Sequence, residues 1–352
     1  MQPEPIRLTQ YSHGAGCGCK IAPSVLQEIL HGSSESTAFP QLLVGNGHND
    51  DAAVYDLGNG TALIATTDFF SPIVDDAFDY GRIAAANAIS DVYAMGGRPL
   101  LALAVLGWPV DKLPAGLARQ VLEGARATCA AAGIPLAGGH SIDAPEPFFG
   151  LAVNGNVERT RLKRNNTALE GDLLYLTKPL GVGILSTARK RGVLEPAHEG
   201  LAEAQMLQLN DSGPLLAALE GVTALTDVTG FGLLGHLLEM AGGSGLSAEL
   251  HYNRIPVLEA ARGYLAQRIV PDATYRNWNS YSNRVGFAKD VNVLEAFNLL
   301  PDPQTNGGLL IAVRPAAAPA VEALLRERHP AVAATPIGQL TAAGEKEVNV
   351  LP

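Results

Sequence analysis

The 352-residue sequence has few cysteines, and this scarcity excludes a disulfide-rich fold. Only Cys17, Cys19 and Cys129 occur, and the first two are too close in the chain for ordinary bridge geometry. Proteins of oxidising compartments keep disulfides, whereas proteins of reducing compartments keep free thiols. The cysteine pattern therefore indicates a reducing compartment, and we expect a cytoplasmic protein.

Long apolar runs and excess positive charge are also missing. The apolar run 100–108 is less than half a membrane span, and residues 1–5 lack the basic-then-apolar pattern of a signal peptide. The net charge of −10 and the pI of about 5.3 argue against a nucleic-acid-binding surface. We therefore expect a soluble protein with neither a membrane nor a nucleic acid as partner.

Glycine, in contrast, is abundant. The sequence has 38 glycines, where average usage of about 7% gives roughly 25. They cluster at 138–139, 230–235 and 307–308, a pattern typical of loops that let the backbone approach a ligand. The hydrophobic fraction of 47% is enough for a large core, and the length favours two domains.

Hydrophobic periodicity predicts strands that alternate with helices, as in a mixed α/β or α+β protein. Asn59-Gly60 predicts a hairpin between two β-like runs, and residues 274–283, polar and aromatic, predict a surface loop. A domain boundary is expected near 160–167. The predicted strands are 42–44, 52–55, 61–67, 100–106, 149–157, 173–177, 222–226, 246–251, 309–313 and 332–340, and the predicted helices are 23–30, 80–95, 113–132, 183–191, 202–210, 212–219, 232–241 and 316–328.

The N-terminal stretch His13-Gly14-Ala15-Gly16-Cys17-Gly18-Cys19-Lys20 has two interpretations. Its glycines lose entropy when they are ordered, so packing alone seldom requires them. A thiol near a lysine can have a lowered pKa, and the thiolate is the reactive form. The stretch is therefore either a reactive arm or a disordered leader that contains cysteines.

One carboxylate stands out from the others. Asp50, Asp51, Asp68 and Asp227 adjoin predicted strands, where aspartates are common in turns. Asp91 instead lies in an apolar stretch near the end of a predicted helix, where it loses hydration and faces the unfavourable end of the helix dipole. A carboxylate in this position needs a cation nearby. The candidate ligands are oxygen atoms, with no clear His/Cys cluster, and this favours Mg²⁺.

Two glycine-rich motifs could contact phosphate. Gly138-Gly139-His140-Ser141 offers open backbone amides and a hydroxyl, as in a phosphate-binding turn, but it also fits a simple tight turn after a strand. The stretch 230–235 matches the dinucleotide fingerprint, but Asp227 would place negative charge beside the pyrophosphate. No Walker A sequence is present, so a P-loop fold is not supported.

Together these motifs resemble the selenophosphate synthetase (selenide, water dikinase) family, and the resemblance covers essentially the whole chain. The combination of Gly-Cys-Gly-Cys-Lys with Gly-Gly-His-Ser is its most specific part. The matching stretches are 8–20, 50–54, 66–70, 87–91, 137–141, 225–232 and 302–305. Two departures are Asn306, where the family typically has serine, and the variable loop 47–49.

The resemblance implies that ATP, selenide and water give selenophosphate, AMP and orthophosphate. It implies an aminoimidazole ribonucleotide synthetase-like fold of an α/β half and an α+β half, divided as a glycine-rich catalytic arm (1–20), an ATP- and metal-binding domain (21–160) and a C-terminal domain (161–352). The N-terminal half is expected to pair in a homodimer.

The resemblance also implies roles for individual residues. Cys17 is the catalytic thiol and Lys20 the phosphate-facing amine, with Mg²⁺ as cofactor. The implied metal ligands are Asp51, Asp91 and Asp227. The implied ATP contacts are Lys20, His48, Asn49, Asp50, Asp68, Asp91, Gly139, His140 and Ser141, the last three reaching across the dimer.

Two alternatives stay open. One is another ATP-using enzyme of the same superfamily, such as an amidine-ring-forming synthetase or a thiamine-phosphate kinase. The other is a protein that binds nucleotide or metal without turnover. The Cys-Gly-Cys-Lys arm speaks against both enzymes of the first alternative, and selenide-dependent release of AMP would separate all of these functions.

Overall fold

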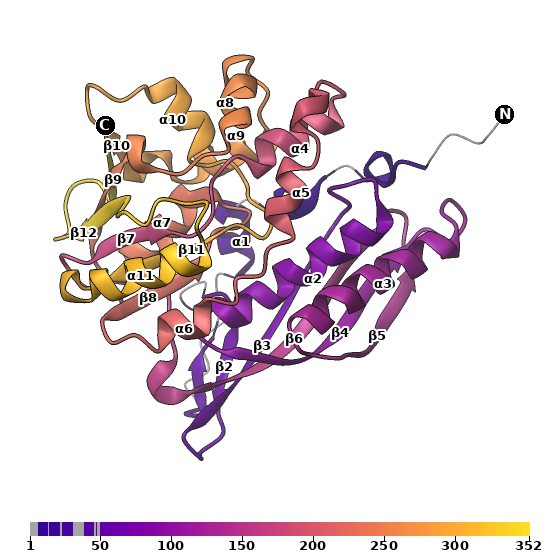
Figure 1. Cartoon of the computed structure of the whole chain (residues 1–352), viewed down its shortest axis with the longest axis horizontal. Helices are drawn as coiled ribbons and strands as arrows, with labels where there is room; N and C mark the ends of the chain where they lie inside the picture. Colours follow the sequence, from indigo (N-terminus) through magenta and orange to yellow (C-terminus); the bar gives the residue numbers. More distant parts are fainter. Residues whose placement is uncertain (1–5, 13, 22, 31–38, 46, 48–49) are drawn as a thin grey trace.

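The computed structural model describes residues 6–12, 14–21, 23–30, 39–45, 47 and 50–352, and it contains two β-sheets with helices packed on them (Figure 1). The six-stranded sheet has the order β1-β2-β3-β6-β4-β5, and the seven-stranded sheet has the order β10-β13-β9-β12-β7-β11-β8. The strands are β1 Leu42–Val44, β2 Ala53–Asp56, β3 Thr61–Phe70, β4 Arg98–Trp108, β5 Leu136–Asp143, β6 Phe148–Glu158, β7 Leu173–Leu176, β8 Val222–Asp227, β9 Ser247–His251, β10 Val285–Phe287, β11 Leu309–Val313, β12 Gly338–Thr341 and β13 Val348–Leu351.

The helices lie between these strands in the chain. They are α1 Pro23–Leu30, α2 Ala77–Ala94, α3 Ala115–Ala131, α4 Val182–Lys190, α5 Leu201–Met206, α6 Gly213–Ala217, α7 Gly232–Gly243, α8 Glu259–Ala266, α9 Asp272–Tyr281, α10 Val293–Leu299 and α11 Ala318–Arg328. In the described part of the chain, none of them has both the length and the apolar character that a membrane span needs.

The six-stranded sheet forms largely as the sequence predicts. The hairpin at Asn59-Gly60 is confirmed, because β2 and β3 pair antiparallel with Tyr55 opposite Leu63. Strand β3 then pairs with β6 along its whole length, from Thr61 opposite Glu158 to Phe70 opposite Phe149. Alternation along β3 directs Asp68 and Phe69 to opposite faces of the sheet.

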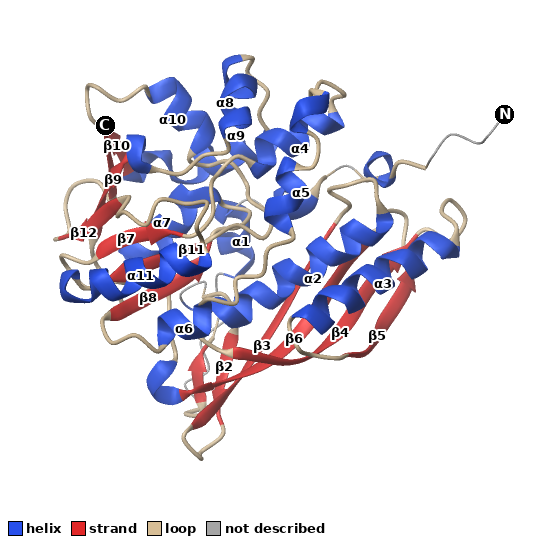
Figure 2. Ribbon diagram, viewed as in Figure 1, coloured by secondary structure: helices blue, strands red, loops and turns tan. Residues whose placement is uncertain are grey.

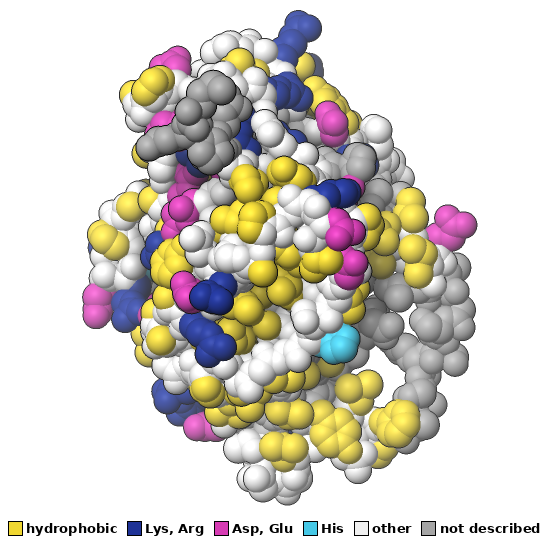
Figure 3. All heavy atoms as spheres, turned by 90° about the vertical axis from the view of Figure 1, so that its right-hand side faces the viewer, with side chains coloured by type: hydrophobic (Ala, Val, Ile, Leu, Met, Phe, Trp, Pro, Cys, Tyr) yellow, Lys and Arg dark blue, Asp and Glu magenta, His cyan; other side chains and the backbone are white. Residues whose placement is uncertain are grey.

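In the part of the chain that the structure describes, helices α2 and α3 cover one face of this sheet. Figure 2 shows α2 and α3 side by side on that face. The opposite face, which we call the outer face, carries large apolar side chains that are exposed in the single chain, namely Tyr55, Phe69, Leu103 and Ile142. A view from the right-hand side of Figure 1 also shows apolar side chains gathered over the middle and lower part of the molecule (Figure 3).

Helices α2 and α3 touch each other through their backbones. A Cβ atom added at Gly81 would lie 1.9 Å from the carbonyl oxygen of Val121, and one added at Gly124 would lie 1.9 Å from the carbonyl oxygen of Phe78. No side chain fits at either position, so both must be glycine. The close contact fixes α2 against α3 and on the sheet.

The second sheet contains fully buried strands. Every residue of β11 is buried, and this strand pairs antiparallel with β7 and with β8. An antiparallel centre of this kind is incompatible with a parallel dinucleotide-binding sheet, so the fingerprint at 230–235 is a structural turn from β8 into α7.

The predicted loop at 274–283 is wrong. Most of this stretch belongs to helix α9, which buries Ala273, Thr274, Asn277 and Tyr281. The signal was missed because the buried positions include polar residues whose partners are distant in the chain. Asn277 donates hydrogen bonds to the carbonyl oxygens of Gly230 and Pro301. Helices α8 and α10 were not predicted either.

Candidate functional site

The glycine-rich arm packs into the interior instead of lying free. Its residues Gly16–Cys19 form a short 3-10 helix, and the side chain of Cys17 is only 1% exposed. Gly16 has a φ of +52°, a backbone conformation that favours glycine, and a Cβ there would lie 2.4 Å from Cδ1 of Ile73. On the other side, a Cβ at Gly230 would lie 2.7 Å from the carbonyl oxygen of Cys17. The arm is therefore enclosed by segments of both halves of the chain.

The Asn87 side chain on α2 connects the arm to strand β3 and to the segment before β11. Its Oδ1 accepts hydrogen bonds from the Cys17 thiol at 3.3 Å and from the backbone N–H of Asn306 at 2.7 Å. Its Nδ2 donates to Oδ2 of Asp68 on β3 at 2.9 Å. The Cys17 backbone N–H donates to Thr305 Oγ1 at 3.0 Å. A buried polar network of this kind is stable because its members satisfy one another.

The expected lowering of the Cys17 pKa is wrong for this arrangement. Burial raises the pKa of the thiol, and the negative charge of Asp68 raises it further. The positive charge of Lys20 and the hydrogen bond with Thr305 lower it, but by less. Cys17 is therefore a protonated thiol here, and its activation requires a change in its surroundings.

Lys20 lies beside the same carboxylate. Its Nζ is 3.4 Å from Oδ2 of Asp68, and its side chain keeps 38% of its surface exposed. Partial burial lowers the pKa of the ammonium, but Asp68 and other nearby acidic groups outweigh burial, so the net pKa lies above its ordinary value. Lys20 therefore carries a positive charge at the surface of the site.

The three carboxylates implied as metal ligands interact with one another. Asp91 on α2 and Asp227 at the end of β8 are buried, and burial raises the pKa of each. Burial also raises the pKa of Asp51, with further contributions from the charges of Asp227 and Asp91. Like charges in a buried space repel, so each carboxylate raises the free energy of ionising its neighbours.

Hydroxyl groups satisfy part of this carboxylate cluster. Thr66 donates to Asp91 at 2.5 Å, and Thr226 donates to Asp51 at 2.8 Å. Ser90 donates to Asp227 at 2.5 Å. The second oxygen of Asp51, Oδ2, is buried and has no hydrogen-bond partner. The cluster therefore has acceptor capacity that the protein does not use.

The structure does not present a finished metal site. Among the residues that it describes, no group of three or more His, Cys, Asp or Glu side chains is arranged to hold a metal ion. The three carboxylates come from α2, from the end of β8 and from the segment before β2, so their approach depends on packing between the two halves. The orphaned oxygen of Asp51 and the mutual repulsion of the carboxylates are two features that a bound cation would relieve.

The remaining predicted ATP contacts are spread more widely. His48 and Asn49 lie outside the described residues. Asp50 Oδ1 accepts a hydrogen bond from the backbone N–H of Asn165 at 2.8 Å, which joins the two halves.

Both interpretations of Gly138–Ser141, a phosphate-binding turn and a simple tight turn, are wrong about the local structure, because these residues lie within strand β5. A Cβ at Gly139 would lie 2.2 Å from the carbonyl oxygen of Ala104, so glycine permits β5 to pair closely with β4. Strands β6 and β4 separate β5 from Asp68 on β3, a distance of about 14 Å at roughly 4.8 Å per strand. Within one chain, Gly139, His140 and Ser141 are therefore not brought to Cys17.

Several residues that contact the site had no predicted role. They are Thr66, Asn87, Ser90, Thr226, Thr305 and Asn306. Helical spacing offered one signal, because residues three and four apart share a face and Asn87 stands four residues before Asp91. The contacts of Thr305 and Asn306 join segments more than 200 residues apart, and no local pattern reveals such contacts.

Comparisons with known proteins match both halves of the chain. The family described as AIR synthase related protein, N-terminal domain, matches residues 49–157, and the corresponding C-terminal domain matches residues 170–351. Among solved structures, a thiamine-monophosphate kinase from Stenotrophomonas maltophilia is 22% identical with a TM-score of 0.65, covering 88% of this chain and 91% of that one. The hydrogenase maturation protein HypE is 22% identical with a TM-score of 0.64, covering 87% and 86%. These likenesses show the fold, which is the one predicted.

Curated relatives are much closer in sequence. A selenide, water dikinase of Yersinia pseudotuberculosis is 57% identical over 345 residues, covering 98% of this chain and 97% of its own length. A selenide, water dikinase of Bordetella bronchiseptica is 57% identical over 347 residues, covering 99% of both chains. At this identity, over nearly the full length of each protein, the chain belongs to the selenide, water dikinase family.

Proposed function

We propose that this protein synthesises selenophosphate from ATP, selenide and water, with release of AMP and orthophosphate. The observation that carries the proposal is the position of Cys17 and Lys20, which share the carboxylate of Asp68 as a neighbour and lie near a cluster of three further carboxylates. A soft thiol and a cation suited to contact phosphate thus occupy the same site. The family relationship supports the same reaction.

ATP is the proposed phosphoryl donor. The proposed contacts within the main site are Lys20, Asp50, Asp68 and Asp91, together with His48 and Asn49. A related structure of HypE, with a TM-score of 0.63, is described as a complex with ATP, which supports a nucleotide site in this fold. An exposed ammonium group at a site lined by carboxylates is suited to contact the terminal phosphate of ATP.

Asp51, Asp91 and Asp227 are the proposed ligands of Mg²⁺. The residues fit such an ion because they supply carboxylate oxygens, one of them buried without a partner, and because a cation removes their mutual repulsion. When bound, Mg²⁺ would neutralise the charge of the phosphates. Thr66, Ser90 and Thr226 orient the three carboxylates by the hydrogen bonds described above.

The residues of the arm have separate roles in this proposal. Lys20 offsets negative charge on the phosphoryl group, and Cys17 orients selenium, because a soft thiol suits a soft partner. Asn87 positions the thiol and Asp68 together, since one amide group bonds to both. The closed packing of the arm excludes water from the thiol.

A homodimer is proposed from the outer face of the six-stranded sheet. Phe69, Leu103 and Ile142 are exposed there, and a second copy would cover them. His140 lies opposite Val105, so it shares the outer face, and Gly139 and Ser141 belong to the exposed edge strand. We propose that these three residues contact ATP bound by the partner chain.

The division into an arm (1–20), an ATP- and metal-binding domain (21–160) and a C-terminal domain (161–352) stays a proposal, as does a cytoplasmic location. In the structure, the six-stranded sheet comprises strands of residues 42–158 and the seven-stranded sheet strands of residues 173–351. The proposed boundary lies between these two sets of strands.

The test is release of AMP from ATP that depends on selenide. We expect the purified protein to form AMP, orthophosphate and selenophosphate in equal amounts when ATP, Mg²⁺ and selenide are supplied anaerobically. Without selenide, AMP formation should fall to background. Equal AMP release with and without selenide, or phosphoryl transfer to another acceptor, would contradict the proposal.

A further inference from the structure

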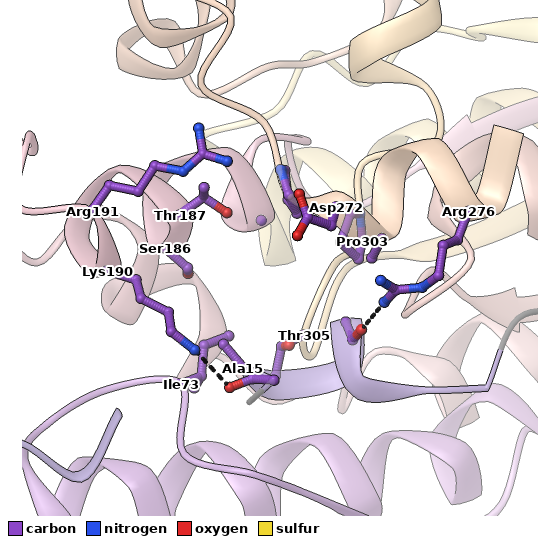
Figure 4. Close-up of a pocket in the computed structure, with 15 residues that line it drawn as sticks. Ala15, Ile73, Ser186, Thr187, Lys190, Arg191, Asp272, Arg276, Pro303 and Thr305 are labelled. Atoms are coloured by element: carbon purple, nitrogen blue, oxygen red, sulfur yellow. Dashed lines mark hydrogen bonds between the residues drawn. The ribbon is translucent and has the colours of Figure 1, made fainter. Parts of the chain in front are cut away.

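A cavity lies beside the arm, and its lining contains none of the three clustered carboxylates. It has a volume of about 300 Å³, and its walls come from the arm and from helices α4 and α9. Figure 4 shows Lys190 and Arg191 at the end of α4 on one side and Arg276 of α9 on the other, with the arm below them. The cavity therefore borders the backbone of the residues next to Cys17.

The charge of this cavity is opposite to that of the whole protein. Three cationic side chains line it, Lys190, Arg191 and Arg276, against one carboxylate, Asp272. Among the described residues, neither arginine forms an ion pair with a carboxylate; Arg191 donates to the carbonyl oxygen of Val270 at 3.1 Å. A concave, positive site on a protein of net charge −10 attracts anions locally.

Two of these cations also hold the arm. Lys190 Nζ donates to the carbonyl oxygens of Ser12 at 3.3 Å and Gly14 at 3.1 Å, and Arg276 Nη2 donates to that of Gly18 at 2.8 Å. The contacts with Gly14 and Gly18 lie on either side of Cys17 in the chain. They are bonds to neutral acceptors, which are weaker than bonds between the same cations and an anion.

We propose that this cavity binds a small anion and that the bound anion releases the arm. An anion that enters between Lys190 and Arg276 competes with the carbonyl oxygens of residues 14 and 18 for the same donors. The hydroxyl groups of Ser186 and Thr187 on α4 also line the cavity and supply further donors. Release of the two contacts frees the segment that carries Cys17.

The inference rests on the proposed function for the identity of the anion. Small anions of the proposed reaction include hydroselenide as it enters and orthophosphate as it leaves. Both share the chemistry that the cavity recognises, namely negative charge and small size. Occupation by hydroselenide would make a buried thiol accessible when its partner arrives, and occupation by orthophosphate would open the arm for product release.

The first experiment measures release of the arm without turnover. The rate of alkylation of Cys17 by iodoacetamide is followed by peptide mass spectrometry, with inorganic phosphate as the added anion. We expect phosphate to raise this rate about fivefold or more in the wild-type protein, while buried Cys129 stays unchanged. In Lys190→Gln and Arg276→Gln, the rate should already be high without phosphate and should not respond to it.

Matched variants distinguish an effect of the cavity from a general effect of removing a cationic side chain. Lys346→Gln removes a lysine that bonds to a backbone carbonyl oxygen, that of Asn283, on a distant surface, and it should behave as wild type. Arg276→Lys keeps the charge and should keep part of the response, so it also serves if Arg276→Gln does not fold. Two results together would overturn the proposal. Phosphate would leave the rate of Cys17 alkylation in the wild-type protein unchanged, and the variants would keep the wild-type KM for selenide and the wild-type inhibition by phosphate.

The second experiment identifies the anion by steady-state kinetics of AMP release. If hydroselenide is the ligand, Arg276→Gln should raise the KM for selenide at least fivefold and leave the KM for ATP within twofold. If orthophosphate is the ligand, the same variant should weaken product inhibition by phosphate at least fivefold, with the KM for selenide unchanged. Absence of AMP release in the wild-type protein would contradict the proposed function alone, because the alkylation experiment judges the cavity independently.

Discussion

The two polar regions of the site differ in how completely their hydrogen bonds are satisfied. Around Asn87, the amide group bonds to the thiol of Cys17, the carboxylate of Asp68 and the backbone of Asn306. Around Asp227, in contrast, three carboxylates with raised pKa values face one another, and one oxygen of Asp51 has no partner. The Asn87 amide is satisfied within the protein, whereas the carboxylates around Asp227 keep an unpartnered oxygen and their mutual repulsion.

This difference indicates which part of the site the chain forms by itself and which part needs a bound ligand. A satisfied network holds its shape alone, so the thiol has a fixed position before substrates bind. Buried like charges favour a cation or a proton among them. Substitutions in the Asn87 region should therefore affect stability, and substitutions in the carboxylate region should affect the response to Mg²⁺.

The largest effect is expected from loss of the thiol. Cys17→Ser should lower selenide-dependent AMP release by about 10³-fold or more, because a hydroxyl group is a much poorer partner for selenium. Binding of ATP, measured by calorimetry, should stay within about threefold of wild type. Cys19→Ser is the control and should be milder, since one thiol suffices. Full activity of Cys17→Ser would contradict the assignment.

The next effect tests the carboxylate region. Asp51→Ala should raise the Mg²⁺ concentration needed for half-maximal activity by about 100-fold, or remove activity, because a proposed ligand is lost. Asp56→Asn is the control, as Asp56 pairs with Arg159 away from the cluster. A Mg²⁺ titration of Asp51→Ala that matches wild type would refute the ligand role.

Removal of the Asn87 side chain tests the polar region around this residue. Asn87→Ala should lower the free energy of unfolding by about 2–3 kcal/mol, because it leaves a buried N–H group of Asn306 and a buried thiol unsatisfied. Urea denaturation without Mg²⁺ measures this change. Asn59→Ala, in the exposed hairpin turn, should change stability less. Equal stability of Asn87→Ala and wild type would show that the network does not hold the site.

The smallest effect concerns a buried carboxylate outside both regions. Burial raises the pKa of Asp302 to about 8, despite hydrogen bonds with Gln304 and with the backbone of Gly183 and Ile184. The unfolded chain releases this proton near pH 4, so between pH 4 and 8 the folded state binds more protons. The contribution of Asp302 to stability should therefore be fully present below about pH 4 and should be lost as the pH rises to about 8.

Asp302→Asn should remove this dependence. We expect the change in unfolding free energy between pH 6 and pH 8 to differ from wild type by about 2 kcal/mol, as measured by urea denaturation at both values. Asp111→Asn, at an exposed position, is the control. A pH dependence of Asp302→Asn identical to that of wild type would show that Asp302 ionises normally.

Local pattern predicted much of the fold and part of the site. Strand β1 and helix α1 have the predicted bounds, and the hairpin forms at Asn59-Gly60. The burial of Asp91 also follows from its apolar neighbours, as predicted. These features depend on residues close in the chain, so periodicity and turn chemistry reveal them.

The failures have a common cause in distant contacts. Helix α9 was predicted as a loop because its burial depends on Asn277 and on aromatic contacts such as that of Trp278 with Phe297, 5.0 Å between ring centroids. The pKa of Cys17 was misjudged because Lys20 is close in sequence, whereas Asp68 and the burying segments are distant. Tertiary packing overrides local signals at these positions.

The glycine contact between α2 and α3 has a consequence for the chemistry. Asn87, Ser90 and Asp91 all belong to α2, so a rotation of this helix about its axis would move the partner of the thiol, the partner of Asp227 and the carboxylate of Asp91 together. Gly81 and Gly124 determine that rotation, because the backbones of the two helices meet there. The alignment of the two polar regions thus depends on a backbone contact that lies outside both of them. The sequence around Gly81 and Gly124 gives no sign of this role.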